Sequence, residues 1–240
     1  MSTDPELVLE VLLRSAEAGD PDAQFRVAEA YRMGVIVPRN YAQALSWCRR
    51  AAEQGHSAAA NNLGSLLLNG LGTDPNPYEA VHWFRLAAEA GDPTARFNLA
   101  LRYLHGTGVT QDDFEAARWL GEAAAQGHTE ATGQLATMIR FGRGLVRDIP
   151  VAAQLHVHAA MQGDITSMGN LSDYLDEIEC AALDGNAHAA RCMAKIFGHG
   201  LSGTKDKAKA LAWIERCENA AGQEGEHIDE LNALKVECSE

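Results

Sequence analysis

The sequence predicts an all-α protein in which pairs of helices repeat and stack in a line, an α/α solenoid. Three observations support this prediction. Tryptophans recur every 36 residues, at positions 47, 83 and 119, and glycines keep the same step, at positions 19, 55, 91, 127 and 163. Apolar residues between these markers recur at helical spacing. A fixed period of this length is typical of stacked units that gain their stability from contacts with their neighbours.

The first helix of each unit is predicted to begin at a capping residue directly after a glycine. Asp20-Pro21 and Asp92-Pro93 combine a side-chain cap with proline at the first helical position. Ser57 and Thr129 are expected to take the same role in other units. An apolar stripe at i, i+4 and i+8 then marks the buried side of the helix. Its members are Ala23, Val27 and Tyr31, then Ala59, Leu63 and Leu67, then Ala95, Leu99 and Tyr103.

The second helix follows a glycine-rich loop such as Gly106-Thr107-Gly108-Val109. It carries Ala116, Trp119 and Ala123 at three- or four-residue steps. The alanines allow close helix approach, and the tryptophan fills the space between units. The predicted units are a half repeat at 5–19, repeats at 20–55, 56–91, 92–127 and 128–163, a shortened unit at 164–185, and a last repeat at 186–222.

The end of the chain keeps the repeat register with some departures. Leu155 replaces the tryptophan of the fourth repeat, whereas Trp213 lies where the register places it after the shortened unit. That unit, 164–185, is expected to be one long helix or two very short ones. Residues 223–240 are expected to form an acidic capping helix over the last repeat. The expected apolar face of this helix is Ile228, Leu231, Leu234 and Val236.

These residues resemble the Sel1-like repeat family, a relative of the tetratricopeptide repeat. The family pattern of alanine, leucine, tyrosine, Gly-x-Gly-Val, tryptophan, Ala-Ala and glycine is matched most fully by residues 92–127. The resemblance covers residues 5–222, with departures in the half repeat, in the loop of 20–55 and in 164–185. It implies a right-handed α/α superhelical solenoid that holds another protein.

Charge and cysteine content narrow the expected partners and compartment. The net charge of −13 disfavours nucleic acid and favours a basic protein partner, although solubility alone also explains an acidic chain. No signal segment or membrane-spanning run is found, so we expect a cytoplasmic protein with no membrane partner. The five cysteines have no repeat phase, which favours reduced, buried thiols.

The sequence contains no motif for catalysis, a metal or a cofactor. It has neither a phosphate-binding loop nor a His-Glu-x-x-His pair, and His156 and His158 point to different sides of a helix. His56 and His128 share the first position of their repeats, where a role at the helix start is expected. We therefore predict a chain without catalytic residues, metal or cofactor.

The candidate partner-binding site is a concave groove lined by the first helix of each unit, as in related superhelices. Positions 3, 6, 10 and 13 of the repeat supply its side chains. Phe25 and Phe97 are expected to be half-buried, and Leu101 and Leu104 are either exposed in the groove or packed in the core. The predicted groove residues are Phe25, Glu29, Arg32, Asn61, Ser65, Leu68, Thr94, Phe97, Leu101, Leu104, Thr137, Arg140, Arg191 and Lys195.

The leading functional hypothesis is a non-enzymatic scaffold that binds one protein in this groove. An apolar centre with charged ends is typical of an interaction site. The family suggests a bacterial adaptor or an immunity protein that neutralises a basic toxic effector. Two alternatives remain open: a protein that binds or hydrolyses cell-wall fragments, and a self-associating structural protein, so the chain itself is expected to be a monomer or a weak homo-oligomer.

Overall fold

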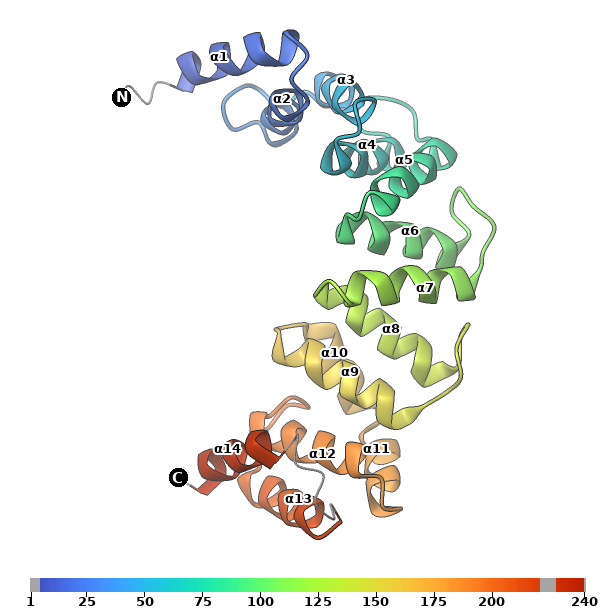
Figure 1. Cartoon of the computed structure of the whole chain (residues 1–240), viewed down its shortest axis with the longest axis vertical. Coiled ribbons are helices and arrows are strands. Elements are labelled where there is room, and N and C mark those ends of the chain that lie inside the picture. The colour runs from blue at the N-terminus through green and yellow to red at the C-terminus, as the bar shows by residue number, and fades with distance from the viewer. Residues whose placement is uncertain (1–4, 221–227, 240) are drawn as a thin grey trace. The chain divides into compact units, whose positions relative to one another are not determined.

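The computed structural model describes residues 5–220 and 228–239 (Figure 1). These residues form fourteen helices and no strand, which confirms the predicted all-α class. The chain divides into two compact units, Met1–Gln126 and Gly127–Glu240. In both units, each helix packs mainly on its neighbours in the chain, as expected for a solenoid.

The first unit consists of a lone helix followed by three helix pairs. We call the first helix of each pair helix A and the second helix B. The A helices α4 and α6 contact each other as well as their B helices. The helices are α1 (Pro5–Glu17), α2 (Pro21–Met33), α3 (Tyr41–Ala52), α4 (Ser57–Asn69), α5 (Pro77–Glu89), α6 (Pro93–His105) and α7 (Asp113–Ala124).

Alanines and tryptophans form the contacts between successive pairs. Ala95, Leu99 and Ala116 are completely buried. Trp47, Trp83 and Trp119 expose only 9%, 8% and 6% of their surface. An indole that buries roughly 200 Å² contributes on the order of 5 kcal/mol before conformational entropy is subtracted. The recurrence of tryptophan in the sequence therefore marks the largest buried side chain of each of these pairs.

Histidines cap two of the A helices, which confirms the role at the helix start expected for His56 and His128 and corrects the caps expected at Ser57 and Thr129. Nδ1 of His56 accepts from the backbone N–H of Ala59 at 3.1 Å, and Nδ1 of His128 accepts from that of Ala131 at 3.3 Å. Ser57 and Thr129 are instead the first residues of their helices. The expected caps at Asp20 and Asp92 are present, because each carboxylate lies one residue before its helix.

The second glycine of the Gly-x-Gly loop allows the loop to lie against the preceding pair. Gly108 has a φ of +74°, and a Cβ there would overlap the backbone of Pro77 at the start of α5. Gly72 has a φ of +81° and lies in the same way against Tyr41 at the start of α3. Only glycine, which has no Cβ, can combine this conformation with so close an approach.

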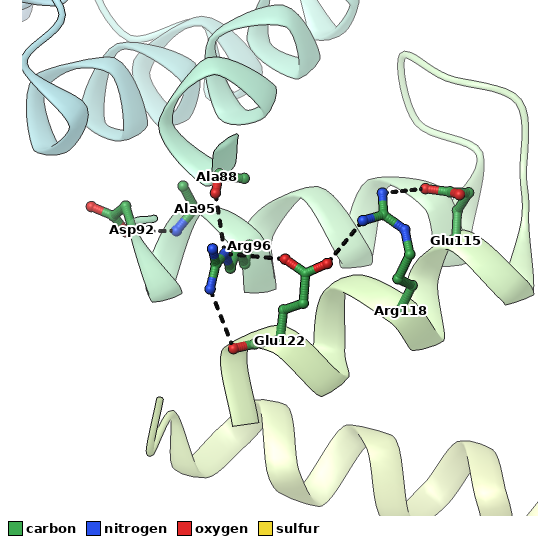
Figure 2. A network of polar contacts seen from close by, with 7 residues as sticks. All are labelled: Ala88, Asp92, Ala95, Arg96, Glu115, Arg118 and Glu122. Carbon is green, nitrogen blue, oxygen red and sulfur yellow. Dashed lines mark hydrogen bonds and ion pairs between the residues drawn. The ribbon is translucent and has the colours of Figure 1, made fainter. Parts of the chain in front are cut away.

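Polar contacts of Arg96 join α5, α6 and α7 in the first unit, and Arg118 extends these contacts along α7 (Figure 2). Arg96 on α6 donates from Nε to the carbonyl of Ala88 at 3.1 Å and pairs with the Glu122 carboxylate at 3.5 Å. Arg118 donates to Glu122 at 2.9 Å and to Glu115 at 2.8 Å. Arg96 therefore links α6 and α7 to the end of the preceding B helix.

The second unit contains one regular pair, a shortened pair and a final pair with an added helix. The shortened unit is two nine-residue helices separated at Tyr174, which decides between the two alternatives expected for it. Its short length brings α12 into direct contact with α9. The helices are α8 (Thr129–Phe141), α9 (Ile149–Met161), α10 (Ile165–Asp173), α11 (Leu175–Leu183), α12 (Ala187–His199), α13 (Lys207–Ala220) and α14 (Ile228–Ser239).

The last helix, α14, packs on α12 and α13. Leu231 and Leu234 are buried, and a Cβ at Gly198 of α12 would overlap the Leu234 side chain. Val236 was expected on the same face but is 60% exposed, and Cys238 is buried in its place. Cys238 lies one helical turn beyond Leu234, whereas Val236 lies two residues away on the opposite side. The side chain of Ile228 and residues 221–227 lie outside the described residues.

The five cysteines are all free thiols. Cys48, Cys192, Cys217 and Cys238 are buried, as expected, but Cys180 on α11 is exposed. Burial raises the pKa of Cys48 and of Cys192 to about 12. Only Cys180 therefore combines a free thiol with access to solvent.

Candidate functional site

The candidate site in the first unit is the face of α2, α4 and α6 that carries the predicted groove residues. We call it the inner face and define it by the residues that remain at least partly exposed. Two predicted members are excluded because they are buried. The inner face consists of Phe25, Glu29, Arg32, Ser65, Leu68, Thr94, Phe97 and Leu101.

Leu104 and Asn61 are corrections to the predicted groove, since they expose only 6% and 9% of their surface. Leu104 lies one turn beyond the fully buried Ala100 and continues that buried stripe. Asn61 accepts a hydrogen bond from Nδ2 of Asn98 on α6 at 2.8 Å. Both side chains therefore belong to the contacts between helices.

The apolar part of the inner face is Leu68, Phe97 and Leu101. All three side chains are half-buried, which is the expected state for Phe97 and places Leu101 between the two states expected for it. Thr94 beside them is exposed. Partly exposed leucines next to a polar edge are typical of surfaces that bind other proteins.

The polar part lies on α2 and the start of α4. Arg32 donates two hydrogen bonds to the Glu29 carboxylate, at 2.7 and 2.8 Å, and Nδ2 of Asn62 donates to the same carboxylate at 2.8 Å. This pairing raises the pKa of the Arg32 guanidinium above its usual value. Phe25 stacks on His56 with their ring centres 4.6 Å apart. These side chains are therefore held in place before any partner arrives.

A hollow of about 400 Å³ lies at the polar end of the inner face, between α2 and α4. It brings together two of the predicted groove residues, Arg32 and Ser65. Asn62 also lines it, and no feature of the repeat pattern pointed to this residue. The other lining residues are Met33, Arg39, Tyr41, Leu66, Asn69 and Leu71.

In the second unit, Thr137 and Arg140 are engaged in helix packing. Arg140 lies over the ring of Tyr174 at 4.2 Å and pairs with Glu177 at 3.3 Å, and its side chain is only 14% exposed. The Thr137 hydroxyl bonds to the carbonyl of Gly133 at 3.0 Å and accepts from Asn170 at 3.3 Å. Neither side chain is free to bind a partner in this arrangement.

Arg191 and Lys195, the last two predicted residues, lie on α12 and line a second hollow, of about 550 Å³. Lys195 pairs with Glu230 of α14 at 2.8 Å. The opposite wall belongs to α9 and includes Gln154, His158 and Met161. The repeat pattern did not predict this wall, because it assigns α9 to the B helices, outside the groove.

A histidine, a serine and an aspartate meet beside α8. The same three residue types also occur together in catalytic sites. Nδ1 of His156 lies 3.1 Å from the Ser167 hydroxyl, which donates to Asp164 at 2.5 Å. His156 is completely buried, and this burial lowers its pKa to about 4. The aspartate contacts the serine rather than the histidine, and Ser167 is also buried. The cluster is built for packing and offers no access to a substrate.

The described residues add two observations on other kinds of site. Among them, no group of three histidine, cysteine or acidic side chains is placed to hold a metal ion. Their helices also include none long and apolar enough to cross a membrane.

Stacked helix pairs with tryptophan-filled contacts define the chain as a helical repeat protein. The Sel1 repeat model matches residues 21–56, 57–92, 93–128, 129–164 and 187–216. The chain belongs to the Sel1 repeat family, which confirms the resemblance. Residues 165–186, which include the two short helices, lie outside the matched ranges.

Solved structures agree with this family. The chain is similar to c5321, a protective antigen present in uropathogenic Escherichia coli strains, with 28% identity and a TM-score of 0.70. The match covers 100% of this chain but only 58% of that one. A Sel1 repeat protein from Oxalobacter formigenes has 28% identity and a TM-score of 0.64, over 96% of this chain and 71% of that one. A search of curated proteins gave no significant match.

Proposed function

We propose that the chain is a non-enzymatic scaffold that binds a partner protein on its inner face. The observation that carries this proposal is the partial exposure of Leu68 and Leu101 on neighbouring A helices. Tryptophans and alanines already fill the contacts between pairs, so these leucines are not needed there. Sel1 repeat folds are typically interaction scaffolds, and family membership supports this class of function.

The partner is proposed to be a basic protein, with this chain acting as an adaptor or as an immunity protein against a toxic effector. The net charge of −13 supports this choice, because it attracts a basic partner and repels nucleic acid. Five unpaired cysteines fit a reducing compartment such as the cytoplasm. The immunity role is the most specific part of the proposal and rests on the family resemblance together with this charge.

Affinity capture with matched variants tests the proposal. Leu68→Glu and Leu101→Glu place charge on the inner face, whereas Tyr78→Glu changes a side chain on α5 that is already 77% exposed. We expect the first two variants to lose the captured protein and the third to retain it. Binding should also weaken as salt rises, since attraction between opposite charges is screened. The proposal is contradicted if the inner-face variants still capture the same protein. It is also contradicted if the partner is neutral and binds independently of salt.

Self-association is a second candidate because α1 carries an uncovered apolar face. Val8 and Val11 are 44% and 60% exposed and line a hollow of about 440 Å³ between α1 and α2. A second copy is proposed to cover this face. Sedimentation velocity at several concentrations tests the idea. A dimer that Val11→Glu abolishes supports it, and a monomer at every concentration excludes it.

A further inference from the structure

The hollow between α9 and α12 has a composition unlike that of the acidic chain around it. Its volume of about 550 Å³ lies within the range of ligand-binding cavities. The apolar part of its lining is Val151, Leu155, Val157, Met161 and Cys192. The polar part is Gln154, His158, Gln162, His188, Arg191, Lys195 and Glu230.

The hollow exists because two repeat features are missing at the same place. Leu155 stands where Trp47, Trp83 and Trp119 fill the corresponding space in other pairs. The shortened α10 and α11 also let α12 contact α9 directly. Because leucine is smaller than tryptophan, Leu155 leaves space between α9 and α12. These two helices are in contact because the pair of helices between them is short.

The charge of the lining is mainly positive. Arg191 and Lys195 lie one helical turn apart on α12, and His188 lies one turn before Arg191. Glu230 pairs with Lys195 at 2.8 Å. Within the described part of the chain, Arg191 has no carboxylate at ion-pair distance. An arginine with open donors beside an apolar wall is suited to a carboxylate, which it can bind through two hydrogen bonds.

We infer that this hollow binds an acidic residue of a partner protein together with the apolar residue next to it. The carboxylate bonds to Arg191 and to the imidazoles of His188 or His158. The apolar side chain takes the space over Leu155 and Met161 that the missing tryptophan leaves. The inference rests on the proposed scaffold function, and it adds a second contact that selects for one acidic residue in a partner that is basic overall.

Selection from a random peptide library displayed on phage tests this inference on the full chain. We expect enriched peptides to share an aspartate or glutamate beside leucine, methionine or an aromatic residue. A synthetic copy of the best peptide is then measured by fluorescence anisotropy. Replacing its acidic residue by the matching amide should weaken binding by at least about tenfold, since a buried charge pair is lost.

Two variants of the chain fill or reverse the site. Leu155→Trp restores the residue of the other repeats and fills the hollow, and Arg191→Glu reverses its charge. Both should abolish binding of the peptide, whereas Lys205→Glu, an equal change on an exposed loop, should leave it unchanged. Thermal unfolding of Leu155→Trp separates a filled site from a misfolded chain, and we expect its midpoint to match or exceed that of the parent protein.

A library without an acidic consensus, or a peptide whose binding survives Leu155→Trp in the folded variant, overturns the inference. Leu101→Glu serves as the separate test of the inner face. Loss of binding with Leu155→Trp but not with Leu101→Glu supports the hollow alone. Loss of partner capture with Leu101→Glu alone supports the scaffold function without this hollow.

Discussion

Asn98 on α6 donates from Nδ2 to Oδ1 of Asn61 on α4 at 2.8 Å. Asparagines at the same position of two other units make the same kind of contact with the preceding A helix. Asn62 donates to Glu29 at 2.8 Å, and Asn170 donates to Thr137 at 3.3 Å. Neighbouring A helices are thus joined by side-chain hydrogen bonds as well as by apolar packing.

Removing one partner of this contact should destabilise the first unit. Asn98→Leu leaves the buried Asn61 amide without its donor, and an unsatisfied buried polar group costs about 1–3 kcal/mol. Urea unfolding followed by circular dichroism measures the change. Asn69→Ala, at an exposed residue that bonds only within its own helix, is the control and should cost less. Equal effects of the two substitutions refute the role given to the Asn98 contact.

The Gly-x-Gly loop offers a test of close backbone approach. Gly108→Ala and Gly55→Ala both place a Cβ at positive φ, +74° and +87°, which costs about 1–2 kcal/mol. Only the Cβ at position 108 also overlaps Pro77, whereas nothing lies within 4 Å of the one at position 55. We therefore expect Gly108→Ala to be more destabilising by about 1–3 kcal/mol. Matching unfolding midpoints for the two variants rule out this explanation.

The stability of the second unit should fall at acid pH because of His156. Its pKa is lowered from 6.5 to about 4, mainly by burial; the charge of Asp164 opposes this shift and that of Arg140 adds to it. The unfolded chain therefore binds a proton that the folded chain excludes. The stabilising contribution is complete above pH 6.5 and declines toward pH 4, by on the order of 3 kcal/mol.

The double variant His156→Leu with Ser167→Ala supplies the control for this pH dependence. Leu120 and Ala131 each occupy the corresponding position of the preceding repeat, and each is completely buried. The double variant should fold, and it should lose the part of the pH dependence of stability that His156 causes between pH 6.5 and pH 4. A slope identical to that of the parent protein shows that the loss of stability comes from other groups.

Thiol accessibility gives a direct readout of the packing. Only Cys180 is exposed, and burial raises the pKa of Cys48, Cys192 and Cys217 above the usual value of a thiol. Since the thiolate is the reactive form, we expect one fast reaction with Ellman's reagent in the native protein. Cys180→Ser should remove it, and denaturant should expose the remaining thiols. Fast reaction of several native thiols contradicts the described burial.

The repeat spacing was sufficient to predict the fold class and the family, because the tryptophan and glycine positions mark buried contacts directly. The histidine caps were harder to predict. His56 and His128 precede serine and threonine, which are the commoner capping residues. A capping role for histidine depends on the orientation of its ring, which sequence spacing does not determine.

The candidate site could be predicted only in part. Positions along one helix placed Leu68, Phe97 and Leu101 on a partly exposed face. They did not reveal that Leu104 continues the buried stripe of Ala100, because one residue of difference rotates a side chain by about 100°. The hollow beside Arg191 depends on contact between α9 and α12, which are separated in sequence by the two short helices. Leucine stands at position 155, where other repeats have tryptophan, and this was the feature of the sequence that could have indicated the space.

Acrylamide quenching of tryptophan fluorescence tests the central claim, that indoles fill the contacts between stacked helix pairs. Trp47, Trp83, Trp119 and Trp213 expose between 6% and 9% of their surface. The native protein should therefore show emission at short wavelength and weak quenching, and unfolding in denaturant should shift the emission to longer wavelength and strengthen the quenching. Strong quenching in the native protein, equal to that of the unfolded chain, would place the indoles in water and contradict the stacking on which the proposed scaffold depends.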